Sequence, residues 1–291
     1  MKRLFVVLVA ICLAAPAQAS PPEPAPYAGR PEVQAFIRQM VTHHAFNASE
    51  LRQLFARAKR EQAVLDAIRP TSSEADRSWD IYRGIFVNQK RISAGLEFWS
   101  RYNDVLARAQ RVYGVPEEFI VAIIGVETFY GRHTGQWRVV DALATLAFDY
   151  PPRSGFFRQE LANYLLFARK AGIDVFSVKG SYAGAIGIPQ FMPGSYLRYA
   201  VDFDGDGVAD LSNSVADAIG SVANYLKQHG WQSGEAVQYQ ARVSGGEFRS
   251  FLDGGLQPRH LRAELAKAGI VPADPAEAPR DDTRAVLVKL E

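Results

Sequence analysis

The spacing of apolar residues predicts a mainly helical chain between residues 32 and 227. A helix is expected to begin after Asn47, because four apolar side chains recur there at helical spacing: Leu51, Leu54, Phe55 and Ala58. Further helices are expected over residues 92–112, from Pro116 onward, and over 157–171, where Gly172 follows.

The pattern changes after Trp231. Residues 236–243 alternate like a strand, 261–268 suit a short helix, and 284–290 alternate again. The last of these strands has no evident partner in the sequence. The expected fold class is therefore mainly α, classed as α+β because of a small β-containing region at the C-terminal end.

Five segments follow from these patterns. Residues 1–19 are predicted to be a signal peptide and residues 20–31 a proline-rich, extended linker. Residues 32–104 are expected to form an N-terminal helical domain, residues 105–235 the core, and residues 236–291 a small α/β region.

The first segment has the three parts of a secretory signal. Lys2 and Arg3 precede the apolar run 4–15, and the small residues of 17–19 supply a cleavage site. This run is too short to span a bilayer, and no later stretch has the length and apolarity of a transmembrane helix. Cys12 lacks the small residues that precede an acylated cysteine, so export as a soluble periplasmic protein is favoured over lipid anchoring.

Composition and charge narrow the possible functions. The chain of 291 residues is 48% hydrophobic and 22% charged, which is typical of a globular protein. Without Lys2 and Arg3 of the signal, 31 of the 33 basic residues remain against 31 acidic ones. A neutral chain offers no field that attracts polyanions, so nucleic acid is excluded as an expected partner. Since Cys12 is the single cysteine, the mature chain has no thiol nucleophile.

The segment FIVAIIGVETFYG places a carboxylic acid after an apolar run. Eight uncharged residues, 119–126, lead directly to Glu127. Desolvation would raise the pKa of that carboxyl and keep it able to donate a proton, as a glycosidase acid does. An ion-paired or capping glutamate beside a core helix is the alternative, and the segment alone leaves both open.

A second segment, SYAGAIGIPQFMPGSY, combines glycines with polar and aromatic residues. Glycine permits close approach of backbone to a ligand, and Gln190 offers a donor and an acceptor to a sugar. The segment lacks the ending of a phosphate-binding loop. Taken alone, it is better explained as a tight packing loop between helices.

The third segment, DFDGDG, resembles the start of a helix–loop–helix calcium site. Acids occupy loop positions one, three and five, and glycine occupies position six; the acids are Asp202, Asp204 and Asp206. Val208 would offer its backbone carbonyl at position seven. Position twelve is Asn213 instead of Glu, and Asp217 could complete the ligands. An Asx-rich turn is the alternative.

In order, these segments resemble the lytic murein transglycosylase B family. The resemblance runs nearly continuously over residues 81–231, and four stretches carry it: VYGVPEEFIVAIIGVETFYGRHTG, DALATLAFDYPPRSGFFRQEL, SYAGAIGIPQFMPGSYLRYAVDFDGDG and DAIGSVANYLKQHGW. It implies a lysozyme-like helical core that cleaves the β-1,4 bond from N-acetylmuramic acid to N-acetylglucosamine in peptidoglycan. The product would carry a 1,6-anhydromuramoyl end.

The resemblance also implies roles for individual residues. Glu127 matches the family's catalytic acid. The substrate-contacting positions match Tyr82, Arg153, Ser181, Gln190, Phe191 and Tyr225. A structural calcium ion in loop 202–217 would be held by Asp202, Asp204, Asp206, Val208 and Asp217, with one extra residue before the last. No organic cofactor is implied, and the partner is the glycan strand of peptidoglycan.

The chain departs from the family's pattern in two places. Pro152-Arg153 stands where the family usually has two arginines. The family also continues beyond residues 284–291 by several dozen residues, which include an RYN-type segment and a closing helix. A truncated or divergent enzyme is therefore one expectation. A lysozyme-type hydrolase and a catalytically weak glycan-binding protein are the alternatives.

Overall fold

The computed structural model describes residues 26–69, 78–252, 255 and 257–290. The predicted signal peptide, with Cys12, lies outside the described residues. None of the helices described there is both long enough and apolar enough to cross a membrane.

The chain divides into two compact units between Arg57 and Ala58. The first contains a short 3-10 helix and two α-helices: η1 (Tyr27–Gly29), α1 (Pro31–His44) and α2 (Ala48–Arg57). Asn47 begins α2 as predicted, because its Oδ1 accepts from the N–H groups of Ser49 and Glu50. Residues 20–31 are expected to form an extended linker. The part of this segment that the structure describes is folded, because η1 forms there and Tyr27 is buried.

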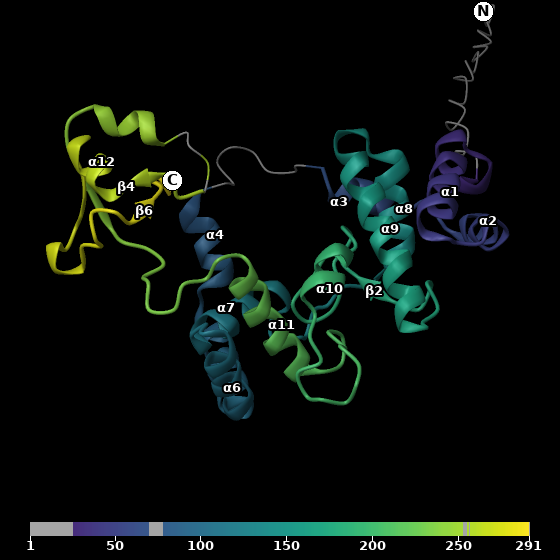
Figure 1. Ribbon diagram of the computed structural model, residues 1–291, viewed down its shortest axis with the longest axis horizontal. Coiled ribbons are helices and arrows are strands. Elements are labelled where there is room, and N and C mark those ends of the chain that lie inside the picture. The colour runs from purple at the N-terminus through teal and green to yellow at the C-terminus, as the bar shows by residue number, and fades with distance from the viewer. Residues whose placement is uncertain (1–25, 70–77, 253–254, 256, 291) are drawn as a thin grey trace, which may run out of the picture. The chain divides into compact units, whose positions relative to one another are not determined.

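The second unit begins with helices on which the predicted site depends (Figure 1). In chain order they are α3 (Gln62–Ala67), α4 (Trp79–Phe86), α5 (Gln89–Arg101), α6 (Asn103–Tyr113), α7 (Glu117–Thr128), α8 (Val139–Asp149), η3 (Pro151–Arg153), α9 (Ser154–Ala171), α10 (Pro193–Tyr199) and α11 (Val215–Gln228). The helices α8 and α9 pack along each other, and α10 contacts both α9 and α11. Two short strands, β1 (Trp137–Arg138) and β2 (Lys179–Gly180), pair antiparallel.

A hydrophobic core lies among α5, α6, α7 and α11. Its buried apolar side chains come from these helices and from two loops: Phe98, Leu106, Ala109, Val115, Ile120, Val121, Ile124, Ile188, Ala218, Ile219, Val222 and Ala223. The apolar run before Glu127 therefore supplies one wall of this core. Burial of such side chains is the main force that fixes α7 in place.

Close approach of Tyr130 explains a glycine in each of two helices. A Cβ atom at Gly95 of α5 would lie 2.5 Å from Oη of Tyr130, and one at Gly125 of α7 would lie 2.6 Å from it. The Tyr130 hydroxyl instead fits between the helices and donates to the carbonyl of Arg91 at 3.1 Å. Burial raises the pKa of Tyr130 although Arg91 opposes this, so the phenol keeps its proton and remains a donor.

Two helix boundaries differ from the sequence prediction. The helix expected over 92–112 is interrupted at Tyr102, whose φ of −113° and ψ of 22° separate α5 from α6. At this break the Tyr102 ring packs against Phe98, and the two ring centroids are 4.9 Å apart. Pro116 is the N-cap of α7, in extended conformation, and the helix itself begins at Glu117. Gly172 ends α9 in the left-handed conformation, as predicted.

The C-terminal part of this unit contains short paired strands around a small core. Strand β3 (Ala241–Val243) pairs with β5 (Ile270–Pro272), and β4 (His260–Leu261) with β6 (Arg284–Ala285), all antiparallel. The helix α12 (Arg262–Lys267) separates β4 from β5, and two 3-10 helices complete this part, η4 (Glu247–Phe251) and η5 (Pro275–Glu277).

The prediction of an unpartnered strand over 284–290 is wrong. Only its first two residues are strand, and they pair with β4. The N–H of Arg262 donates to Thr283 O next to these pairs. The strand expected over 236–243 is likewise confined to its last three residues. The mainly α fold class with a small C-terminal β-containing region is confirmed.

Candidate active site

Glu127 lies in the last turn of α7, at the end of the helix's apolar run. Its side chain reaches solvent. Surrounding protein atoms nevertheless desolvate the carboxyl, and this burial raises its pKa above the usual value of 4.5. The predicted pKa shift and its predicted cause are thus both present in the structure.

The chain reverses sharply just after Glu127. Phe129, Tyr130 and Gly131 have φ values of 51°, 61° and 82°, all in the left-handed region. The N–H groups of Phe129 and Tyr130 donate to the last carbonyls of α7, which satisfies a helix end that would otherwise lack partners. Two successive left-handed residues other than glycine are unusual, so the surrounding contacts must hold this reversal.

Thr128 joins the end of α7 to the predicted substrate loop. Its side chain is 1% exposed. The hydroxyl donates to the carbonyl of Ile188 at 2.8 Å and accepts from the N–H of Gly131 at 2.9 Å. One buried hydroxyl therefore holds both the reversal and the loop next to Glu127.

Loop 181–191 is closed by bonds within itself. Ser181 accepts at its Oγ from the N–H of Ala185, and their backbones bond in the opposite direction at 2.9 Å. Ile186 and Phe191 exchange two backbone hydrogen bonds. The loop is thus a tight turn, as one of the sequence interpretations expected.

Gln190 sits in a strained conformation within this loop. Its φ is 52°, and its Nε2 donates to the carbonyls of Gly187 at 2.8 Å and Thr134 at 3.1 Å. Thr134 follows the reversal after Glu127, so Gln190 makes the second link between the two predicted motifs. Strain of this kind persists when neighbouring contacts over-determine the backbone, which is common at functional sites.

Phe191 and Tyr225 contact each other, although 34 positions separate them in the sequence. Their ring centroids are 5.4 Å apart. His229 stacks on Tyr225 at 4.0 Å with an interplanar angle of 26°, and Tyr199 contacts both of these rings. These four rings form one aromatic cluster across α10, α11 and the loop before them.

Two predicted substrate-contacting residues, Tyr82 and Arg153, contact aromatic rings outside this cluster. Tyr82 of α4 is 51% exposed, and its ring lies 4.8 Å from that of Phe86. Arg153 places its guanidinium 4.5 and 5.2 Å from the rings of Phe156 and Phe157. In the part of the chain that the structure describes, no hydrogen bond, ion pair or ring contact joins Arg153 to another predicted site residue.

The acidic loop gathers three of its predicted ligands. Oxygen atoms of Asp202, Asp204 and Asp217 lie within 4.8 Å of one another. Asp217 is fully buried in the first turn of α11, where its carboxylate accepts from the N–H groups of Phe203 and Asp210 at 2.7 and 2.8 Å. A set of closely spaced carboxylate oxygens suits a hard cation such as Ca²⁺.

The other two predicted calcium ligands are arranged differently. Asp206 is outside the group of three, and its Oδ1 accepts from the N–H of Val208 at 2.8 Å. The side chain of Val208 is 58% exposed, which is consistent with a residue that would contribute only its backbone carbonyl.

A buried carboxylate holds the chain that follows the substrate loop. Glu160 of α9 is 6% exposed, and its Oε2 accepts from the N–H of Gly194 at 2.8 Å. Its Oε1 accepts from Asn163 on the same helix. Since Gly194 lies in the first turn of α10, this contact fixes the loop at the end opposite to Ser181.

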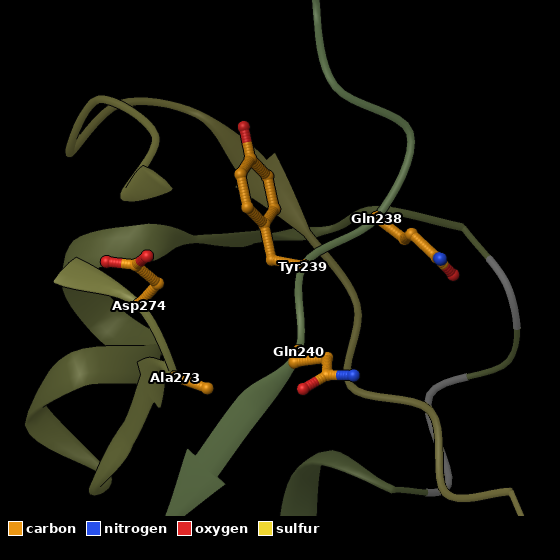
Figure 2. A pocket seen from close by; sticks show the side chains of 5 residues that line it. All are labelled: Gln238, Tyr239, Gln240, Ala273 and Asp274. Carbon is orange, nitrogen blue, oxygen red and sulfur yellow. The ribbon is translucent and has the colours of Figure 1, made fainter. Parts of the chain in front are cut away.

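An open hollow lies elsewhere, between β3 and the turn after β5. Figure 2 shows its lining, which consists of Gln238, Tyr239, Gln240, Ala273 and Asp274. None of these is a predicted site residue. Asp274 is already bonded, because its carboxylate accepts from the N–H of Ala276 and begins η5.

Sequence reasoning missed several contacts around the predicted residues. Thr128 is part of the same motif as Glu127, but nothing in the pattern shows where its hydroxyl points. His229 was detectable in principle, because its spacing of four from Tyr225 places both on one face of a helix. Tyr199 gave no such signal, since it joins the cluster only through tertiary packing.

Comparison with known proteins agrees with the geometry. The transglycosylase SLT domain family matches residues 28–291. The chain is 45% identical to membrane-bound lytic murein transglycosylase B of Escherichia coli over 257 residues, 86% of this chain and 70% of that protein. The catenated lytic transglycosylase SltB1 of Pseudomonas aeruginosa superimposes with a TM-score of 0.83 at 48% identity, covering 89% of this chain and 84% of that one. Escherichia coli Slt35, solved in complex with calcium, gives 0.78 at 42% identity, covering 91% and 81%.

Replacing Thr128 by valine tests its role as the link between α7 and the loop. Thr128→Val keeps the shape but leaves the buried Ile188 carbonyl and the half-buried Gly131 N–H without this partner. We expect the free energy of unfolding to fall by about 1–3 kcal/mol in denaturant titrations. The control is Thr134→Val, whose hydroxyl makes no hydrogen bond among the described residues and should change stability by less than about 0.5 kcal/mol. Wild-type stability of Thr128→Val would contradict the assignment.

Proposed function

Because the chain belongs to the family of transglycosylase SLT domains and is a lytic murein transglycosylase, we propose that Glu127 serves as its single catalytic acid and base. The bond cleaved is the β-1,4 bond from N-acetylmuramic acid to N-acetylglucosamine in peptidoglycan. The observation that carries this proposal is a carboxyl whose pKa is raised by burial, at the end of a helix that packs in the core among α5, α6, α7 and α11.

The reaction needs one group that first gives and then takes a proton. Protonated Glu127 donates to the glycosidic oxygen while the bond to the anomeric carbon breaks and an oxocarbenium-like state forms. The 6-hydroxyl of the same muramoyl sugar then attacks the anomeric carbon, and the Glu127 carboxylate takes its proton. The product is a 1,6-anhydro end, and Glu127 is protonated again. An internal nucleophile has a large effective concentration, so no water has to be activated.

The electrostatics of Glu127 favour this route over a hydrolysis in which a second carboxylate acts as nucleophile. Glycosidases that use a nucleophile place their two carboxyl groups about 5–5.5 Å apart. At that distance the second negative charge would itself raise the pKa of the first group. Burial is the cause of the Glu127 pKa shift, and no carboxylate among the described residues contributes to it.

The residues around loop 181–191 are suited to hold the glycan strand. Ser181 and Gln190 offer polar groups, and the half-buried ring of Tyr225, packed on the buried Phe191, offers an aromatic surface for a sugar ring. The bonds of Thr128 and Gln190 fix this loop relative to α7. Tyr82 and Arg153 are proposed as further contacts, on the resemblance and on their exposed positions.

Calcium is proposed as a structural ion of loop 202–217. Asp202, Asp204 and Asp217 would hold it with carboxylate oxygens, and Asp206 and the Val208 carbonyl would complete the ligands. The Slt35 structure with calcium supports this proposal for a related chain. The ion would neutralise carboxylates that otherwise repel one another, and it would stabilise the start of α11.

The proposed place of action is the periplasm, and the product belongs to cell-wall turnover. The tripartite pattern at residues 1–19 supports export, and the peptidoglycan substrate of the proposed reaction lies outside the cytoplasmic membrane.

Replacing the proposed acid should abolish the reaction and spare binding. Glu127→Gln keeps the shape but cannot cycle a proton, so cleavage should fall by at least about a hundredfold while glycan strands still bind. The control is Glu118→Gln, which removes an exposed carboxylate from the first turn of the same helix and should leave the rate near wild type. Mass spectrometry of digested peptidoglycan would count anhydro and reducing ends. Near-native cleavage by Glu127→Gln, or reducing ends from the wild type, would refute the mechanism.

The pKa of Glu127 should appear in the pH dependence of the reaction. Since the first step needs the protonated carboxyl, kcat/KM should fall as the pH rises through the pKa of Glu127. Burial raises that pKa, so the fall should be centred above pH 4.5. A profile of kcat/KM against pH on glycan strands measures this directly. A rate that increased with pH across the same range would mean that another group donates the proton.

Calcium should stabilise the folded chain by mass action. At a concentration one hundred times its dissociation constant, a single ion adds about 2.7 kcal/mol, so the Tm should rise with calcium and fall with a chelator. Asp204→Ala should remove this response. Asp104→Ala, an exposed acid in the first turn of α6, should leave it intact. A Tm of the wild-type chain that ignores calcium would reduce the loop to an Asx-rich turn.

A further inference from the structure

Three cationic side chains surround the ring of Phe129, two residues after Glu127. The Nζ of Lys90 lies 5.6 Å from the ring centroid, and the guanidinium carbons of Arg91 and Arg132 lie at 5.1 and 4.8 Å. Phe129 itself is 7% exposed, whereas Lys90 and Arg132 are open to solvent. None of the three forms an ion pair with a residue that the structure describes.

Aromatic rings extend this group along α4. The Arg91 guanidinium also lies 5.0 Å from the ring of Phe86. The rings of Phe86 and Tyr82 are 4.8 Å apart, and those of Tyr82 and Trp79 are stacked at 5.9 Å. We call these side chains the aromatic–cation row: Trp79, Tyr82, Phe86, Lys90, Arg91, Phe129 and Arg132. The row connects an expected sugar-contacting tyrosine to the segment that follows the proposed acid.

The members of the row differ in their freedom to move. Arg91 is fixed, because its Nη1 donates to the carbonyl of Gly125 at 2.5 Å while its backbone carbonyl accepts from Tyr130. Lys90 and Arg132 make no such hydrogen bond among the described residues, and only the ring of Phe129 holds them. Contact with an aromatic face stabilises a cation but leaves its charge in place, so each can still bind an anion.

The charge of the row is separate from the chemistry of Glu127. Cations close to a carboxyl lower its pKa, and among the described residues no cation contributes to the shift of Glu127. In a chain with nearly balanced charge, three cations that form no ion pair with a described residue gather around a ring two positions after the proposed acid, which favours an anionic ligand that arrives with the substrate.

We propose that the aromatic–cation row is a subsite for the peptide stem of peptidoglycan, in which Lys90 and Arg132 bind the stem's carboxylates while Trp79 and Tyr82 face sugar rings. The inference rests on the proposed function. The muramoyl sugar at the cleaved bond carries the peptide on its lactyl group, so a strand bound at Glu127 brings carboxylates to its flank. Lysine and arginine on an open surface suit a flexible peptide, because their side chains can follow its carboxylates.

The test compares strands with and without peptides. Peptidoglycan is digested either as isolated or after an amidase has removed the stems, and the ratio of the two kcat/KM values is measured. Lys90→Gln combined with Arg132→Gln should lower that ratio about three- to tenfold, the effect of losing two exposed ion pairs. Added salt should lower the ratio of the wild type in the same direction, because such pairs are screened.

Two sets of variants control for folding and for general charge. Lys90→Arg with Arg132→Lys keeps both cations and should keep most of the ratio. Arg111→Gln with Lys267→Gln removes two exposed cations outside the row and should leave the ratio unchanged. An unchanged ratio in the Lys90→Gln, Arg132→Gln variant would overturn the proposal. An error in the assignment of Glu127 would appear instead in the Glu127→Gln digest and would leave this ratio unaffected.

Discussion

A buried hydroxyl holds the two halves of the candidate site together. The Thr128 hydroxyl donates a hydrogen bond to the Ile188 carbonyl and accepts one from the Gly131 N–H, so the end of α7, the left-handed reversal and the substrate loop share one side chain. The apolar residues of α7 place this hydroxyl in the core, where a polar group without a partner is costly. The position of Glu127 therefore depends both on the apolar packing of α7 and on the hydrogen bonds of Thr128.

The sequence was sufficient for the elements that depend on local signals. The Asn47 cap, the glycine at the end of α9 and the apolar run before Glu127 are all read from neighbouring residues, and the structure has each of them. The acidic loop is a similar case, because its spacing alone brought Asp202 and Asp204 together. The desolvated carboxyl at Glu127 was predictable because it lies at the end of a long apolar run.

What the sequence could not show depends on contacts between distant segments. The break at Tyr102 occurs within a continuous helical pattern, and it is fixed by packing of its ring on Phe98. The residues 286–290 alternate like a strand but make no strand pairs. Pairing depends on a partner strand, and β4 is only two residues long and pairs with Arg284 and Ala285. Cation contacts on Phe129 join α5 to the chain after α7, and no spacing rule connects those positions.

The carboxylate of Glu160 has a consequence for selectivity. It holds Gly194 at one end of the loop, while bonds within 181–191 close the other, so little freedom is left to the segment between them. The loop therefore loses its conformational entropy when the chain folds, and it does not lose that entropy again when a glycan strand binds. A preorganised loop of this kind selects among glycan strands because it does not rearrange to fit them. A strand whose sugars do not match the loop binds weakly and dissociates before proton transfer.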